Sequence, residues 1–207
     1  MQKKLLTLSF KAQYYSGMQT KYLKEVTEII AGYTFREALI SDSNGETQVL
    51  LAKNINTDGT INYPELTKIN LNLPRTNAFI NKNDVLLSSR GIFRSGVFDN
   101  DSTNTIAASS MFILRIKDNS IFPEYLSIYL NTRAGQNCIQ KILTGSTIKT
   151  ILRRSLENLT IPIPPLSIQK MIIDISKNLQ QSEKLLTKKI NLTKNIAEGA
   201  IKLLITN

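Results

Sequence analysis

Histidine and tryptophan are absent from this sequence of 207 residues, and Cys138 is its only cysteine. Without histidine, the chain lacks the most common general base and a frequent ligand of zinc. A single cysteine rules out a disulfide within the chain, which leads us to expect a cytoplasmic protein. No apolar run reaches the roughly 18 residues that suggest a membrane-spanning helix, and Met1–Phe10 is too polar for a signal peptide. No membrane association is therefore expected.

The sequence motifs of several enzyme classes are missing as well. There is no Gly-x-x-x-x-Gly-Lys-Ser/Thr loop, which excludes an ATP-driven motor of that type. There is no Cys-x-x-Cys pair, and no Asp/Glu-x-Lys triplet of the common metal-dependent nucleases. Asn72–Arg75 (Asn-Leu-Pro-Arg) lacks the second proline and the aromatic residue of the amino-methyltransferase motif. We therefore expect no catalytic residues, no metal site and no enzyme activity.

Positive charge is in excess and unevenly distributed. The net charge is +10 and the isoelectric point is about 9.7. Residues 141–207 contain 11 Lys and Arg against 4 Asp and Glu, whereas residues 1–140 contain 15 against 12. A basic C-terminal third favours a polyanionic partner, most often nucleic acid. The alternative is solubilising charge on the surface of a helix.

The middle of the sequence has the pattern of short β-strands. Thr47–Ala52, Asp84–Ser88 and Thr105–Ile116 are rich in β-branched and other apolar residues. Asp58-Gly59 is a turn signal and predicts a hairpin within Asn54–Tyr63.

Helices are predicted on both sides of these strands. Lys21–Ile30 has apolar residues at helical spacing, with Gly32 as its C-cap. Pro123 suits the first position of a helix, and Thr132 can cap a second helix that runs to Ile142. Strands flanked by helices predict an α+β fold: a globular domain with a mixed or antiparallel sheet, followed by one long C-terminal helix.

A proline-rich stretch separates the globular part from this last helix. Leu156–Gln169 reads Leu-Glu-Asn-Leu-Thr-Ile-Pro-Ile-Pro-Pro-Leu-Ser-Ile-Gln, and its prolines exclude an interior strand or a helix. We expect a stiff, extended joint here, with Ser167 as the N-cap of the helix. The predicted divisions are an N-terminal arm at residues 1–19, a globular domain at residues 20–160, the joint at residues 161–167 and the helix at residues 168–205.

The predicted C-terminal helix carries an interrupted apolar stripe. Its spacing is close to that of a coiled coil, with breaks at Ser182, Lys189 and Thr193. A lone helix would leave the stripe in water, so it must pack on its own domain, a second copy or another subunit. The stripe consists of Ile168, Ile172, Ile175, Leu179, Leu186, Ile196, Ala200 and Leu203.

Four segments, in this order, resemble the specificity subunits of type I restriction–modification systems. Tyr22–Gly32 is similar to the family's N-terminal helix and glycine turn, and Asn83–Gly91 is similar to its Gly-Asp-Ile-Leu-Leu-Ser-X-Arg-Gly strand and loop. Thr144–Ile148 resembles its Gly-Ser/Thr loop, and Leu156–Gln169 resembles its proline-rich joint. Asn83 stands where the family usually has glycine, and a turn accepts either residue.

The resemblance implies a non-catalytic, DNA-binding subunit with residues 20–160 as its target-recognition domain. Such a subunit positions a separate methyltransferase subunit and often a restriction subunit, so S-adenosylmethionine and ATP are expected only on those partners. The family joins two recognition domains by two antiparallel helices, whereas this chain has one of each. We expect a homodimer paired through residues 168–205, or one half of a longer or partnered subunit. The alternative is an interaction module whose basic helix docks an acidic protein, with no role for DNA.

Two loops are the first candidates for DNA contact, because arginine can pair with guanine or with phosphate. An exposed hairpin with solvated arginines is the alternative for the first loop, and hydroxyls that cap helix ends are the alternative for the second. The first loop, residues 88–95, offers Ser88, Ser89, Arg90 and Arg94. The second loop, residues 141–154, combines a hydroxyl-rich anion site with cations: Thr144, Gly145, Ser146, Thr147, Lys149, Arg153 and Arg154.

A third candidate is the segment Lys53–Asn56. Its amides are suited to adenine, and the candidate DNA contacts in this segment are Lys53 and Asn54. Asparagine is also a common turn residue, which is the alternative for this segment.

Overall fold

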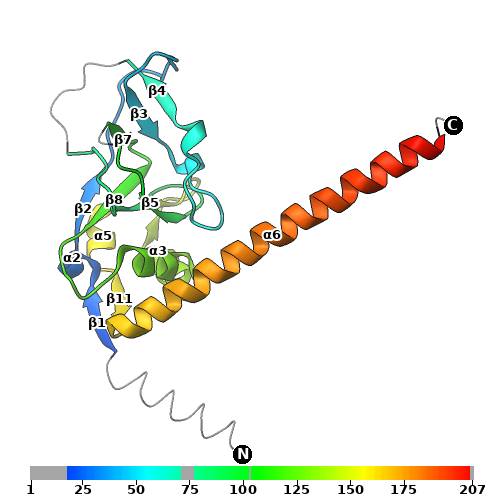
Figure 1. Cartoon of the computed structure of the whole chain (residues 1–207). Helices are drawn as coiled ribbons and strands as arrows, with labels where there is room; N and C mark the ends of the chain where they lie inside the picture. Colours follow the sequence, from blue (N-terminus) through cyan, green and yellow to red (C-terminus); the bar gives the residue numbers. More distant parts are fainter. Residues whose placement is uncertain (1–17, 71–76, 103, 206–207) are drawn as a thin grey trace, which may run out of the picture. The chain divides into compact units, whose positions relative to one another are not determined.

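The computed structural model describes residues 18–70, 77–102 and 104–205, which form two compact units (Figure 1). We call the first unit, which ends at Lys170, the body; the second begins at Met171 and is helical. Nearly all of the predicted N-terminal arm, residues 1–19, lies outside the described residues. None of the described helices is long and apolar enough to cross a membrane.

The centre of the body is a four-stranded antiparallel sheet with the order β2-β8-β5-β6. Its strands are β2 (Thr27–Ala31), β8 (Met111–Ile116), β5 (Val85–Ser88) and β6 (Ser95–Val97). Every residue of β5 and the first four residues of β8 are buried. A strand covered on both faces reads as a continuous apolar run, which explains the pattern of these segments in the sequence.

A three-stranded mixed sheet forms the other part of the body. Its strands are β4 (Thr67–Ile69), β3 (Thr47–Leu50) and β7 (Thr105–Ala107). β3 is antiparallel to β4 and parallel to β7. Leu50 of β3 belongs to the same buried cluster as Leu86 of β5 and Ile113 of β8, so one core joins the two sheets. The predicted α+β class with a mixed or antiparallel sheet is confirmed.

Helices and short turns complete the body. Asn131 ties α3 to β6, because its amide accepts from Ser95 N–H (2.9 Å) and donates to Ser95 O (2.8 Å). The predicted cap at Thr132 is confirmed, since its hydroxyl accepts from Gly135 N–H (3.1 Å). The remaining elements are η1 (Ala52–Asn54), η2 (Tyr63–Glu65), α3 (Pro123–Asn131), α4 (Arg133–Lys141), β9 (Leu143–Thr144), β10 (Thr150–Ile151) and α5 (Arg153–Glu157).

The helix predicted for Lys21–Ile30 is wrong. This segment forms strand β1 (Gln19–Tyr22), a single helical turn, α2 (Leu23–Val26), and then β2. Pairing with β8 buries Ile29 and Ile30 in the central sheet. Burial against a partner strand far along the chain outweighs the helical spacing of the apolar residues.

Gly32 is required by the sheet and does not cap a helix. Its N–H donates to Met111 O (3.0 Å). A Cβ at this position would lie 1.9 Å from Ala108 O, so any larger residue would force the backbone apart.

Part of the joint predicted at residues 161–167 is a β-strand. β11 (Thr160–Ile163) is antiparallel to β1, with Pro162 opposite Thr20. Proline is compatible with this pairing because both strands of a two-stranded sheet are edge strands. Helix α6 (Leu166–Ile205) begins before the predicted N-cap Ser167, so that prediction is wrong. The carbonyl of Pro165 accepts the N–H groups of the first turn instead.

Candidate DNA interface

The first two candidate loops come together in the body. Arg90 and Thr150 form an antiparallel bridge, and Gly91 N–H donates to Lys149 O (3.2 Å). The hairpin between β5 and β6 is thereby joined to the hairpin between β9 and β10. We call these two segments, residues 88–95 and 143–151, the paired loops.

Ser88 and Ser89 do not belong to the exposed surface of the paired loops. Both are buried. The Ser88 hydroxyl donates to Ile92 O and accepts from Arg94 N–H (2.9 Å), which closes the hairpin from inside. This burial removes Ser88 and Ser89 from the candidate interface.

The two arginines of the first loop have different surroundings. Arg94 is half-buried, and its guanidinium donates to Ile55 O (3.0 Å), so it links the hairpin to the loop after η1. This contact occupies one N–H group of the guanidinium, and Arg94 stays a prediction as a DNA contact. Arg90 is exposed at the bridge to Thr150 and stays a candidate.

In the third candidate segment, Asn54 is not accessible to DNA. Asn54 is fully buried, its carbonyl oxygen accepts from Leu51 N–H (2.9 Å), and its amide nitrogen donates to Glu65 O (3.1 Å). An amide that is enclosed in this way cannot read adenine, so the prediction for Asn54 is wrong. Lys53 is exposed and stays a weak candidate.

The loop between β9 and β10 is exposed throughout Thr144–Lys149. Gly145 has a φ of 91°, and a Cβ there would lie 2.4 Å from Ile148 O. The turn therefore requires glycine, because a larger residue would be strained and would also collide with the loop. Ser146 and Thr147 are exposed beside this turn, so their hydroxyl groups are accessible to an anion.

Two cations follow directly on the short helix α5. Arg153 and Arg154 are exposed, and Arg153 Nε donates to Glu157 at 3.0 Å. Arg153 also lines a shallow hollow of about 370 Å³ together with Lys24 and Lys117. Glu28 and Glu157 line the same hollow, so its charge is mixed.

The sequence interpretation missed two apolar residues of the paired loops. Ile92 is 69% exposed and Ile148 is 64% exposed. Each lies two residues beyond the Arg90–Thr150 bridge, one on each loop, so they belong to the same end of the paired loops. An isoleucine at the tip of a polar, Gly-containing hairpin was the available signal, because neither position has strand or helix neighbours to bury it.

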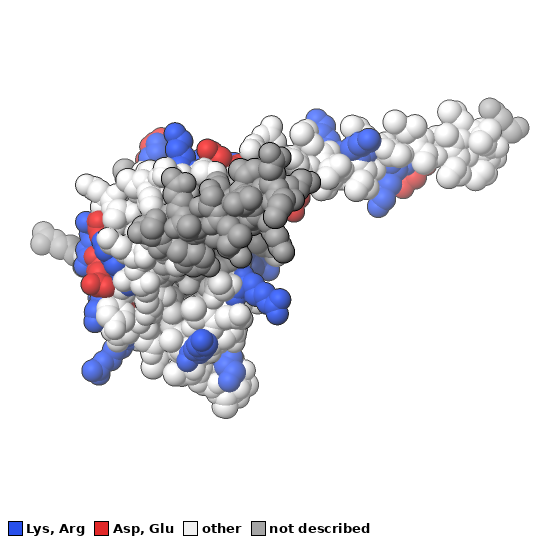
Figure 2. Space-filling view, turned by 90° about the horizontal axis from the view of Figure 1, so that it is seen from below, with Lys and Arg blue, Asp and Glu red and all other residues white. Residues whose placement is uncertain are grey.

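The charged side chains on the face shown in Figure 2 are dispersed and do not form one continuous patch. Lys and Arg stand among uncharged residues, and Asp and Glu are fewer. On this face, positive charge is therefore offered by separate side chains and not by a continuous surface.

The clearly shifted pKa values of the described residues belong to groups outside the paired loops. Burial raises the pKa of the Tyr63 and Tyr129 phenols, and the neighbouring Asp84 raises the pKa of Arg115. A hydrogen bond from Lys21 lowers the pKa of Asp118 to about 2. The paired loops present cationic side chains, hydroxyls and N–H groups, which suit the binding of an anion.

The second unit, by itself, is a helix with apolar side chains in solvent. In the predicted stripe, Ile175, Leu179, Leu186, Ile196 and Leu203 are exposed, whereas Ile168 and Ile172 are half-buried. Further exposed apolar residues on this helix are Leu185, Ile190, Leu192 and Ile201. The exposed apolar surface is therefore broader than the predicted stripe.

The features to compare with known proteins are a mixed α+β body with cationic exposed loops and a long helix that follows it in the sequence. A family model described as the type I restriction modification DNA specificity domain matches residues 15–194. The chain belongs to this family, whose role is DNA sequence specificity and not catalysis.

Solved structures of specificity subunits share the fold. The S subunit of a type I restriction-modification system from M. genitalium has a TM-score of 0.52 at 18% identity, over 76% of this chain and 37% of that chain. The HsdS subunit from Thermoanaerobacter tengcongensis has a TM-score of 0.57 at 20% identity, over 81% and 38%. A structure described as the basis of complex assembly and conformational transition of the type I R-M system has a TM-score of 0.61 at 22% identity, over 82% and 40%. The present chain thus spans about two fifths of the length of these proteins.

Proposed function

We propose that this chain reads one half of a bipartite DNA target through the paired loops and α5. The observation that carries the proposal is the bridge between Arg90 and Thr150, because it gathers two hairpins into one exposed, cationic edge. Membership in the DNA specificity family supports the same role.

We assign different tasks to the two kinds of residue at this edge. Arg90 contacts a base edge, since a guanidinium can pair with guanine in two places, and Ile92 and Ile148 contact thymine methyl groups. The other exposed groups contact phosphates and fix the register of the protein on the duplex. These are Thr144, Gly145, Ser146, Thr147, Lys149, Arg153 and Arg154.

We propose further that the chain positions a separate methyltransferase subunit and, where one is present, a restriction subunit. S-adenosylmethionine and ATP then bind to those partners, and the present chain requires no cofactor of its own. Support comes from the family and from the sequence, which lacks the phosphate-binding and methyltransferase motifs.

The second unit supports a homodimer. Apolar side chains along α6 are exposed at spacings of three and four residues, as in a helix that pairs with another helix. Pairing two copies through α6 relates the two bodies by a twofold axis, and identical bodies read identical half-sites. The target is then a split palindrome.

The decisive experiment is a map of modified bases in the host genome, with and without this gene. Loss of one split, methylated motif is the expected result, and two inverted, identical halves would support the homodimer. An unchanged map in a strain whose methyltransferase subunit is active would contradict the proposal.

A second candidate function is an interaction module without DNA. The observation that favours it is α6, whose exposed leucines and isoleucines alternate with lysines and could dock an acidic protein. Binding to the mapped motif and to a scrambled duplex at several salt concentrations separates the two candidates. Specific binding that weakens steeply with salt supports the DNA role, whereas equal, weak binding to both duplexes supports the interaction module.

A further inference from the structure

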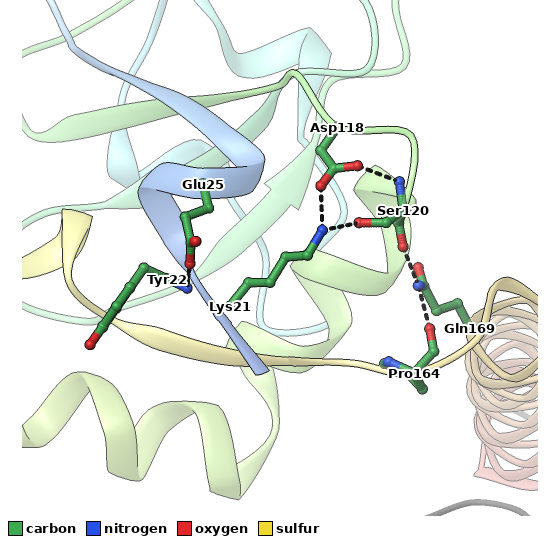
Figure 3. A network of polar contacts seen from close by, with 7 residues as sticks. All are labelled: Lys21, Tyr22, Glu25, Asp118, Ser120, Pro164 and Gln169. Carbon is green, nitrogen blue, oxygen red and sulfur yellow. Dashed lines mark hydrogen bonds and ion pairs between the residues drawn. The ribbon is translucent and has the colours of Figure 1, made fainter. Parts of the chain in front are cut away.

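A network of polar side chains near β1 and β11 is used within the fold. Lys21 Nζ donates to Asp118 (2.6 Å) and to the Ser120 hydroxyl (3.1 Å) (Figure 3). The Gln169 amide donates to Ser120 O (2.7 Å) and to Pro164 O (2.8 Å). Because these groups satisfy one another, the network stabilises the body. The paired loops differ, since their outer side chains are exposed.

Two isoleucines of the paired loops are exposed although apolar neighbours in the same segments are buried. Ile92 is 69% exposed and Ile148 is 64% exposed. Phe93 and Ile151, which lie one and three residues further along the chain, are buried. A single exposed isoleucine is ordinary on a protein surface, so the inference depends on how these two are placed.

The register of the paired loops puts the two isoleucines at opposite positions. The antiparallel bridge joins Arg90 to Thr150. One position further, Gly91 N–H donates to Lys149 O (3.2 Å). In an antiparallel pair, a step forward along one segment corresponds to a step backward along the other. The next step from this hydrogen bond therefore reaches both isoleucines, and residues at opposite positions are close neighbours.

The backbone of each isoleucine is held from within its own loop. Ile92 O accepts from the buried Ser88 hydroxyl, and Ile148 O accepts from the Thr150 hydroxyl (3.4 Å). Gly145 closes the turn before Ile148, with a φ of 91° and no room for a Cβ beside Ile148 O. Because both backbones are already held, little further ordering is needed when the side chains contact a ligand.

The chemistry of the major groove decides what an apolar pair can recognise there. Most groups on the base edges are hydrogen-bond donors or acceptors, and the apolar one is the methyl group at C5 of thymine. Cytosine gains the same methyl group when it is methylated at C5. The two methylated bases differ in the polar group at C4, which is an acceptor in thymine and a donor in cytosine. An isoleucine side chain has neither donor nor acceptor, so it responds to the methyl group alone.

We propose that Ile92 and Ile148 form one apolar site for the C5 methyl group of a pyrimidine, and that this site accepts 5-methylcytosine as well as thymine. The inference rests on the proposed function, in which these side chains contact thymine methyl groups. It goes further by assigning both side chains to one methyl group that two bases share. Recognition then depends on cytosine methylation by other enzymes, because a methylated cytosine replaces thymine at this contact.

The test separates the methyl group from the rest of the base pair. Uracil replaces each thymine of a mapped half-site in turn, and the position with the largest loss of binding is chosen. Four duplexes then carry thymine or uracil opposite adenine, or 5-methylcytosine or cytosine opposite guanine, at that position. They compete for the full-length chain in complex with its methyltransferase subunit.

We expect thymine to bind about fourfold more tightly than uracil, and 5-methylcytosine about fourfold more tightly than cytosine. The reason is that one methyl group leaves water in each comparison. Equal ratios would support the inference, because the methyl group would then act independently of the group at C4. A preference for thymine over uracil without a preference for 5-methylcytosine over cytosine would overturn it.

Serine variants test whether the two side chains contact the same methyl group. Ile92→Ser and Ile148→Ser should each reduce both ratios, and the double variant should lose little more than either single variant. Ile40→Ser is the matched control, because Ile40 is 82% exposed outside the paired loops, and it should leave both ratios unchanged. Effects of the two single variants at different base pairs, or an equal effect of the control, would overturn the inference. The three side chains are exposed, so the substitutions should leave the fold intact.

Failure of the proposed function gives a different result. A wild-type complex that binds the mapped duplex no better than a scrambled one would contradict the proposed function itself. Specific binding of the mapped duplex with no difference between thymine and uracil at any position would overturn the present inference alone. The isoleucines would then be assigned to contact with a partner protein.

Discussion

At the scale of single residues, exposure decides which of the cationic and hydroxyl groups can meet DNA. Arg90, Lys149 and Arg153 are exposed, whereas Ser88 and Asn54 are enclosed by hydrogen bonds to backbone groups. The sequence suggests the right residue types, but it does not show which of them are already satisfied within the fold.

Arginine substitutions should separate base reading from phosphate contact. Arg90→Ala is expected to weaken binding by about 1–3 kcal/mol and to relax preference at one base pair. Replacing Arg153 and Arg154 by Ala should weaken binding to all sequences alike and reduce the salt slope by about 1 per lost phosphate contact. Titrations of the mapped duplex and of single-base variants at several salt concentrations measure both effects. If the two sets of variants behave alike, the assignment of base and phosphate contacts is wrong.

The exposed isoleucines of the paired loops give a second prediction at this scale. Ile92→Ser should reduce discrimination at one thymine by about 1 kcal/mol, because the serine cannot replace the apolar contact with the methyl group. Folding stability should change by less than about 0.5 kcal/mol, since the side chain is exposed. Ile40→Ser, at an isoleucine that is 82% exposed outside the paired loops, is the control. Competition between duplexes with thymine and uracil at each position measures the effect, and equal responses of both variants would contradict it.

At the scale of elements, pairing between distant segments explains most differences from the sequence interpretation. β3, β5, α3 and α4 follow the predicted segments because their apolar runs or helix-start residues are visible in a short sequence window. Lys21–Ile30 differs because its partner strand, β8, lies about 90 residues later and is invisible to a short sequence window. Asn83 behaves as its turn position suggests, with a φ of 70° that asparagine tolerates.

An ion pair with one buried partner supports the contact between β5 and β8. Asp84 is only 2% exposed and accepts from Arg115 Nε (3.0 Å) and Nη2 (2.8 Å), and from Asn81 N–H (2.7 Å). Asp84→Ala leaves the partly exposed guanidinium of Arg115 without its carboxylate and should lower the free energy of unfolding by about 1.5–3 kcal/mol. Asp101→Ala removes an ion pair of similar length, to Lys82, that is exposed, and should cost less than about 1 kcal/mol. Urea unfolding of both variants measures the two losses in the free energy of unfolding. Equal losses would show that the Asp84 pair contributes no more than the exposed pair.

At the scale of the whole molecule, the candidate interface is assembled from hairpins that are separated in the sequence by strands β7 and β8 and helices α3 and α4. The sequence indicates each loop through its residue types. It does not indicate that the two loops lie side by side, because a loop sequence does not specify its neighbours in space. The exposed apolar surface of α6, by contrast, follows from the sequence, since a helix of this length has regular spacing and no predicted mate within the chain.

Self-association through α6 is the prediction that belongs to this scale. Leu186→Lys adds a charge within the apolar stripe and should convert a dimer into a monomer at micromolar concentration. Asn191→Lys adds the same charge to an exposed position outside the stripe and should leave the dimer intact. Sedimentation equilibrium of both variants and the wild type measures the change. A monomeric wild-type protein at this concentration would exclude the homodimer.

The pairing of β1 with β11 has a consequence for how the body can be exchanged. These two strands lie at the beginning and the end of the body and are antiparallel to each other over four residue pairs. The points at which the chain enters and leaves the body therefore lie side by side. A body with different loops can be inserted between the same two points without a change in the residues that flank it.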